Sequence, residues 1–242
     1  MKNNRTHSLV SFLSYTVGIV IGLFLIIIAT WADMESAFYG FSRYAEAGLD
    51  GFSCPVLMTS DETGTISLSV SNKTDRVLTP SIKTDISTPI LPLEIDEKIE
   101  LAPGESKKLT WSVGPDNIDL GHFIFAKAMV YSVYPIANQE ATCGIYILDL
   151  PGSGRVILPI LVVLSILGMG WGLYEINKAG ELNDWPERNF RALAFMAAMV
   201  VLGFGVSFWG GWVPAVLLVA AVVLLIITLL VSLLMSERRK HW

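Results

Sequence analysis

The chain has 242 residues, of which 52% are hydrophobic and only 16% are charged, and its mean hydropathy is +0.55. This excludes an ordinary soluble globule, in which roughly 25% of residues are charged, and a disordered chain, which lacks apolar surface to bury. The formal net charge of −5 excludes a nucleic-acid-binding protein that works by bulk positive charge, which leaves an integral membrane protein.

Four uncharged stretches hold most of the apolar residues. Each reaches the roughly 18 to 20 apolar residues that cross a ~30 Å hydrocarbon core as an α-helix. We therefore expect four transmembrane helices, at residues 9–32, 156–174, 192–209 and 213–235. Only Gly210, Gly211 and Trp212 separate the last two, so they should form a tight helical hairpin.

Two basic residues, Lys2 and Arg5, precede the first stretch, just as basic residues precede the apolar region of a secretory signal. Such a region usually has about 7 to 15 residues, far fewer than residues 9–32 contain. We therefore interpret this stretch as a signal anchor that follows a cytoplasmic tail at residues 1–8.

The distribution of Lys and Arg predicts the topology, because short loops rich in these residues stay in the cytoplasm. Residues 33–155 contain nine basic and 17 acidic side chains, whereas the remaining short segments contain eight basic and five acidic ones. We expect both termini and the loop at residues 175–191 to be cytoplasmic, and residues 33–155 to be extracytoplasmic. In the tail at residues 236–242, the expected topology anchors are Arg238, Arg239 and Lys240.

The extracytoplasmic segment has the alternating pattern of β-strands. Residues 65–71 and 108–113 alternate strictly between apolar and polar side chains. Further strands are expected at residues 54–59, 77–86, 93–101, 122–134 and 142–149. About seven strands in about 100 residues, separated by turn sequences, predict an antiparallel β-sandwich of immunoglobulin-like type.

Residues 54–150 also resemble the immunoglobulin-like modules of exported bacterial and archaeal proteins. The likeness lies in the strand at residues 66–71, the turn Asn72-Lys73-Thr74-Asp75, and residues 101–106 leading into the strand at 109–113. It implies recognition or structural spacing, and no enzyme activity can be carried over from it. The fold class is therefore four transmembrane helices with an immunoglobulin-like antiparallel β-sandwich inserted between the first and second. Asn72-Lys73-Thr74 also matches a glycosylation sequon, which matters only in a host that glycosylates exported chains.

The two cysteines, Cys54 and Cys143, both lie in the extracytoplasmic domain, near its two ends. We expect a disulfide between them, with two unpaired buried thiols as the alternative. The bridge would close a loop of about 90 residues, which corresponds to about 4 to 5 kcal/mol in the chain-entropy model. It would also tie the first strand to the last.

No set of residues points to catalysis or to a metal or other cofactor. The three histidines are His7 and His241 on the predicted cytoplasmic tails and His122 outside. A blue-copper site needs two histidines and a free cysteine, and a zinc site needs three or four ligands. None of the four spans contains an ionisable residue of the kind that marks a proton or ion pathway.

Small residues in the spans predict close packing of helices, either within one chain or between subunits. Gly18 and Gly22 are four residues apart in the first span. The corresponding glycines of the second and third spans are Gly168, Gly172 and Gly203. The hydroxyl groups in the spans can bond to carbonyl groups of their own helices.

The connector at residues 33–53 carries apolar residues every three or four positions, which indicates a short amphipathic helix. This helix would lie on the outer leaflet or against a partner; alternatively, it would pack beneath the β-sandwich. Its apolar contact residues are Met34, Phe38, Phe41, Leu49 and Phe52, with Ala45 on the same stripe.

Together these features predict a non-catalytic accessory or scaffold subunit of a larger assembly in the plasma membrane. Its partners would be other membrane protein subunits and the lipid bilayer, with oligomer formation possible and no nucleic acid. The alternative is a cell-surface receptor or adhesion protein that binds an extracellular ligand, and a transporter component is a third candidate. The short cytoplasmic loop at residues 175–191 has no room for a signalling domain, which favours the scaffold.

Overall fold

The computed structural model describes residues 2–41, 45, 47–131, 137–183 and 187–239. It divides into two compact units, each considered by itself below. The helical unit is Met1–Thr30 with Pro159–Trp242, and the β domain is Trp31–Leu158. The β domain therefore includes the last turns of the first helix and the first turn of the second.

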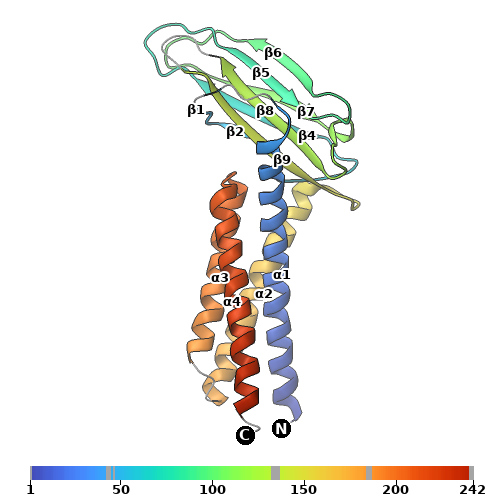
Figure 1. The fold of residues 1–242 in the computed structure, drawn as a ribbon, viewed down its shortest axis with the longest axis vertical. Helices are drawn as coiled ribbons and strands as arrows, with labels where there is room; N and C mark the ends of the chain where they lie inside the picture. Colours follow the sequence, from blue (N-terminus) through green and yellow to red (C-terminus); the bar gives the residue numbers. More distant parts are fainter. Residues whose placement is uncertain (1, 42–44, 46, 132–136, 184–186, 240–242) are drawn as a thin grey trace. The chain divides into compact units, whose positions relative to one another are not determined.

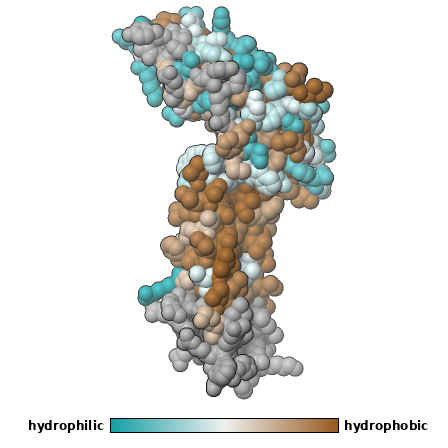
Figure 2. All heavy atoms as spheres, in the orientation of Figure 1, coloured by the Kyte–Doolittle hydropathy of each residue, from teal (hydrophilic) through white to brown (hydrophobic). Residues whose placement is uncertain are grey.

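Four helices are long and apolar enough to span a membrane. Figure 2 shows apolar residues along the helices, whereas much of the surface of the β domain is hydrophilic. In the fourth helix, only 11% of the most apolar 18-residue window is buried, the lowest share of the four. The helices are α1 (Lys2–Phe38), α2 (Gly154–Asn183), α3 (Glu187–Phe208) and α4 (Trp212–Arg239), drawn in Figure 1.

All four helices extend beyond the predicted spans, because hydropathy detects only the apolar part of a helix. The predicted loop at residues 175–191 is mostly helical: α2 continues to Asn183 and α3 begins at Glu187. Residues 184–186 between them lie outside the described part of the chain. The segment between the two predicted spans is therefore helical over most of its length. Arg238 and Arg239 lie in the last turn of α4, and Lys240 lies outside the described residues.

The predicted packing glycines lie where neighbouring helices approach α1 closely. A Cβ atom at Gly18 would lie 2.6 Å from the backbone nitrogen of Met169 on α2. A Cβ at Gly168 would lie 3.0 Å from the Ser14 carbonyl oxygen, and one at Gly172 would lie 2.5 Å from the Tyr15 side chain. Gly22 and Gly203 play the same part between α1 and α3, against Val200 and Ile26 respectively.

Hydroxyl groups add hydrogen bonds between helices, which the sequence analysis did not predict. The Ser165 hydroxyl donates to the Gly18 carbonyl oxygen (2.7 Å), and the Tyr15 hydroxyl donates to the Leu193 carbonyl oxygen (2.8 Å). Ser14 donates to the Gly168 carbonyl oxygen at 3.2 Å. The two bonds between α1 and α2 form where Gly18 and Gly168 let the backbones approach closely. Thr16 and Thr228 do bond within their own helices.

The packing of α1 on α2 gives a direct test. Gly18→Ala should lower the free energy of unfolding by about 1 to 3 kcal/mol, because the new methyl group would overlap the α2 backbone. Gly170→Ala is the matched control, since no atom lies within 4 Å of the corresponding Cβ position. Thermal unfolding in detergent measures both variants. Equal midpoints for the two would contradict this packing.

The β domain contains two sheets. The larger has six strands in the order β1-β9-β8-β5-β6, with β3 also paired to β9; the smaller has the order β2-β4-β7 (Figure 1). Each of the seven predicted strands overlaps one strand of the structure, and two short strands, β1 and β2, were not predicted. The strands are β1 (Ala47–Gly48), β2 (Phe52–Ser53), β3 (Leu57–Thr59), β4 (Gly64–Ser71), β5 (Ser81–Ile86), β6 (Leu93–Lys98), β7 (Ser106–Val113), β8 (Phe123–Tyr131) and β9 (Gln139–Leu148).

The larger sheet is mixed, not purely antiparallel as predicted. β1 and β3 both pair with β9 in parallel, through Ala47 opposite Gln139 and Leu57 opposite Tyr146. The other pairs, such as β8 with β9 and β4 with β7, are antiparallel. The error arose because β1, which lies in the connector, and the short strand β3 both pair with β9, and two or three residues are too few to show alternation.

Both sheets contribute side chains to one apolar core. On β4, Ile66 and Leu68 are buried while Thr65 and Ser69 are exposed, as the alternation predicts. The Trp111 indole donates to Glu97 at 3.0 Å, linking β7 of the smaller sheet to β6 of the larger. The buried core residues are Met58, Ile66, Leu68, Ile82, Ile86, Trp111, Val113, Ile124, Ala126, Ala128, Val130, Ile145 and Ile147.

The predicted amphipathic helix in the connector is not present as a separate element. α1 runs through Phe38 without a break, and the connector then forms β1 and β2. Residues 42–44 and 46 lie outside the described chain. The three-to-four-residue spacing therefore reflects two environments: the last turn of α1 and short strands on the β domain.

Candidate functional site

The last turns of α1 pack directly on β9 of the larger sheet. A Cβ atom at Gly144 would overlap the backbone carbonyl of Ala32, so the position requires glycine. The Gly144 N–H donates to the Asp33 carboxylate at 3.2 Å. Backbone contact of this kind leaves no gap between helix and sheet at this point.

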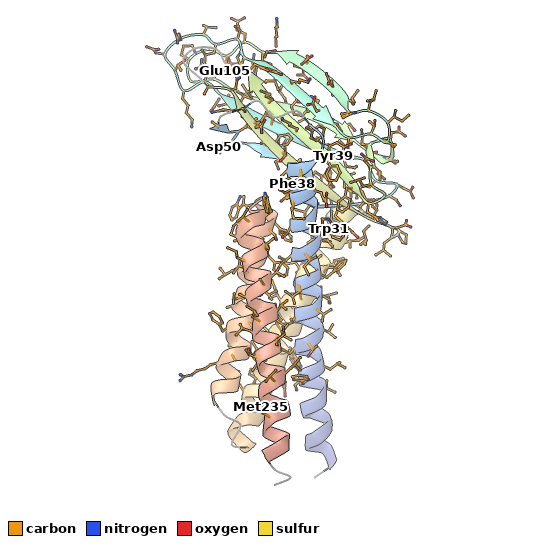
Figure 3. All side chains as sticks on the ribbon, in the orientation of Figure 1. Trp31, Phe38, Tyr39, Asp50, Glu105 and Met235 are labelled. Carbon is orange, nitrogen blue, oxygen red and sulfur yellow. A yellow bond between two sulfur atoms is a disulfide. The ribbon has the colours of Figure 1, made fainter. Side chains whose placement is uncertain are left out.

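An aromatic cluster surrounds this contact on the same face of the sheet. Ala32, Phe41, Phe123 and Phe125 form its buried centre, with Tyr39 and Tyr146 packed against it. The Trp31 and Phe123 ring centroids are 5.8 Å apart, and those of Tyr39 and Phe125 are 4.6 Å apart. Figure 3 labels Trp31, Phe38 and Tyr39 on and just after the end of α1. The cluster fixes the chain where it leaves α1.

Tyr39 adds a polar bond to this cluster. Its hydroxyl donates to the Asp119 carboxylate at 2.5 Å. Burial, together with the hydrogen bond to Asp119 and the negative charge of that carboxylate, raises the pKa of Tyr39 to about 12. The phenol therefore stays protonated at neutral pH and acts as a donor to the loop before β8.

The β domain also holds the N-terminus of α2, through Glu62 in the turn between β3 and β4. The Glu62 carboxylate accepts hydrogen bonds from the Ser153 hydroxyl (2.5 Å), the Gly154 N–H (2.7 Å) and the Thr59 N–H (3.2 Å). It caps the free N–H groups at the start of the helix, where negative charge is favourable. Burial raises the pKa of Glu62, but these donors and Arg155 outweigh it, so the pKa is lower than usual.

The two cysteines form the predicted disulfide. Cys143 lies on β9, next to Gly144, whereas Cys54 lies between β2 and β3 and not within a strand. Both pack against the apolar core. The bridge thus joins the segment that follows α1 to the same strand on which α1 packs.

The predicted contact residues of the connector have different environments. Phe41 is buried in the aromatic cluster, and Leu49 and Phe52 pack against the core of the β domain. Met34 is half-buried on α1, and Phe38 is largely exposed. Three of the five therefore hold the β domain together, and Phe38 is the most exposed of the five, at 69%.

An exposed apolar tip lies on the hairpin between β5 and β6. Ile90 is 89% exposed and Leu91 is 75% exposed. Below the tip, the Ser87 hydroxyl donates to the Asn117 carbonyl oxygen at 2.8 Å, and the Asn117 amide donates back to Ser87 at 3.3 Å. Sequence reasoning missed this tip, although the pattern Pro89-Ile90-Leu91-Pro92, two apolar residues in a turn between prolines, was a usable signal.

A hollow of about 360 Å³ lies at the other end of the strands. Val130 and Tyr131, at the end of β8 opposite Phe123, form part of its wall. Leu78 and Leu101 supply further apolar surface. Asp50 and Lys73 add one charge of each sign, so the hollow suits a small ligand or peptide side chain of mixed polarity.

A buried ion pair lies on the face of the larger sheet that carries the aromatic cluster. The Lys127 ammonium is 3.0 Å from the Glu140 carboxylate on the neighbouring strand β9. Burial raises the pKa of Asp85, opposite Lys127 on β5, while Lys83 and Lys127 act to lower it. Lys127 thus has carboxylates on both neighbouring strands. The pair links β8 to β9 across the sheet. Within the described residues, no three His, Cys, Asp or Glu side chains form a metal-binding group.

Asn72, the first residue of the glycosylation sequon, is buried and fully bonded. Its amide donates to the carbonyl oxygens of Arg76, Leu101 and Ala102. Its side-chain oxygen accepts from the N–H and hydroxyl of Thr74. In the folded domain this side chain locks the turn after β4 and is not available for modification.

No known protein family and no curated protein matches the chain. Solved structures give partial matches to its β-sheet region. The CARDB domain of the PF1109 protein from Pyrococcus furiosus, solved in complex with di-metal ions, is 18% identical over 41% of this chain and 91% of that domain, with a TM-score of 0.33. Beta-glucuronidase 2 from Bacteroides uniformis is 18% identical (40% of this chain, 13% of the enzyme, TM-score 0.31). A beta-glucosidase from Listeria innocua is 15% identical (45% and 17%, TM-score 0.30). These values assign neither a family nor an activity.

The Glu62 cap gives a second test. Glu62→Ala should lower the free energy of unfolding by about 1 kcal/mol at neutral pH, the usual effect of losing a helix cap. Because the folded pKa is below the unfolded one, the stabilisation is complete above the unfolded value of about 4.3 and is lost as the pH falls through the folded value. Denaturant unfolding at several pH values measures this. Asp61→Ala, an exposed neighbour, is the control; an equal effect of both variants would contradict the cap.

Proposed function

We propose that this protein is a non-catalytic accessory or scaffold subunit of a larger membrane assembly. Four helices cross the plasma membrane, both termini are cytoplasmic, and the β domain is extracytoplasmic. The support for this placement is the four apolar helices together with the predominance of Lys and Arg in the short segments outside residues 33–155. The β domain makes the contacts with partner subunits.

The β domain in this proposal is an immunoglobulin-like sandwich. The common core supports this layout, because Ile66 and Trp111 from the smaller sheet and Ile124 and Ile145 from the larger one pack in a single cluster. A sandwich of this kind serves as a scaffold for binding surfaces at its loops and edges.

The observation that carries the proposal is the apolar tip at Ile90 and Leu91. Two large apolar side chains this exposed are costly in water unless another surface covers them. The Ser87–Asn117 hydrogen bonds hold the hairpin below the tip, and proline flanks it on both sides, so little conformational entropy is lost when a partner binds. A rigid apolar projection of this kind fits a groove on a protein partner.

A receptor or adhesion protein is the second candidate, and the hollow beside Tyr131 favours it. Its volume and mixed lining suit an extracellular ligand. The two candidates use opposite ends of the strands, so variants can separate them.

The first candidate predicts a stoichiometric partner that depends on the apolar tip. The protein is purified in mild detergent, and mass spectrometry measures the amount of partner that remains bound. The double variant Ile90→Ser/Leu91→Ser should retain about tenfold less partner than the wild-type protein, as expected for a central apolar contact. Val77→Ser, an exposed apolar residue away from the tip, is the control and should retain it.

Two results would contradict the scaffold proposal. The first is a monodisperse monomer with no partner, and the second is a partner that the tip variant retains in full. A monomer whose ligand binding is abolished by Tyr131→Ala would support the receptor instead.

A further inference from the structure

The loop before β8 contains a leucine in an unfavourable backbone conformation. Leu120 has a φ of 49°, in the left-handed region, and it is the one described non-glycine residue with positive φ. A bulky residue is rare in this region, where glycine or asparagine is the usual choice. The side chain gains no burial in return, because it is 62% exposed. The Leu120 N–H donates to the Asp119 carboxylate at 2.7 Å, but the β domain buries little of the side chain.

This loop lies beside the end of α1. Asp119, next to Leu120, accepts the Tyr39 hydroxyl bond, and it forms an isolated antiparallel bridge with Phe123. The Phe123 ring in turn contacts Trp31. Tryptophan at the end of an apolar helix is typical of the membrane–water interface. Leu120 thus lies in a short loop whose flanking residues, Asp119 and Phe123, both contact residues at or just after the end of α1.

A second exposed leucine lies beside the start of α2. Leu150 is 50% exposed in the short link between β9 and α2. The link is fixed to the turn after β3, because Thr59 donates to the Gly152 carbonyl oxygen at 2.9 Å and Glu62 caps the helix. Arg155, in the first turn of α2, is exposed and carries a charge suited to lipid phosphate.

We propose that Leu120 and Leu150 insert into the interfacial region of the extracytoplasmic leaflet, one beside each helix connection. The apolar layer supplies the burial that the β domain does not give these side chains, and two anchor points resist rocking of the domain on the membrane. This inference rests on the proposed crossing of the membrane by α1 and α2.

Spin labels on single introduced cysteines test the inference in the full chain. The native cysteines are bonded to each other, so they do not react with the label. The variants are Leu120→Cys and Leu150→Cys, with Val77→Cys as an exposed control, in vesicles of phosphatidylcholine and phosphatidylglycerol. Labels at positions 120 and 150 should collide more with oxygen, which concentrates in lipid, than with a water-soluble nickel chelate. The label at position 77 should show the reverse.

A water-like profile at position 120, at position 150 or at both would overturn the two-point contact. Labels at Phe24 on α1 and Val163 on α2, both exposed on their helices, separate this result from failure of the proposed membrane crossing. If these helix labels report lipid and the loop labels report water, only the anchoring is wrong. If the helix labels also report water, the membrane placement itself is wrong.

Discussion

The backbone contact between Ala32 and Gly144 is the constraint on which the β domain depends. It makes the end of α1 part of the larger sheet, because no side chain separates helix from strand. The Phe123 and Phe125 rings are then covered by Trp31, Tyr39 and Phe41 instead of by water. The disulfide, the Tyr39–Asp119 bond and the pairing of β1 with β9 all follow from bringing the chain after α1 onto this strand.

Much of the fold could be predicted, because alternation and hydropathy reflect burial directly. The strict pattern of residues 65–71 identified β4 nearly to the residue, and the long apolar stretches identified all four helices. Partner choice could not be predicted. The pairing of Ala47 with Gln139 and the close approach of Gly144 to Ala32 depend on backbone positions far apart in the chain. A glycine in a strand does not indicate which segment packs against it.

The β domain holds the two helices that enter it, α1 and α2, by different chemistry. At α1 the β domain uses close backbone packing and aromatic rings, whereas at α2 it uses the charge and hydrogen bonds of Glu62. The domain thus has several distinct surfaces. Two contact the helices α1 and α2, and the loops next to these contacts carry exposed leucines. The others are the apolar tip at Ile90 and Leu91 and the hollow beside Tyr131.

Hydrogen–deuterium exchange of full-length Gly144→Ala in detergent tests the central constraint most directly. If the end of α1 packs as an integral part of the β domain, exchange should accelerate together in residues 31–41, in β8 and in β9. The reason is that the new methyl group at position 144 would push the end of α1 away from the sheet. Acceleration confined to β9, with the end of α1 as protected as in the wild-type protein, would contradict the account.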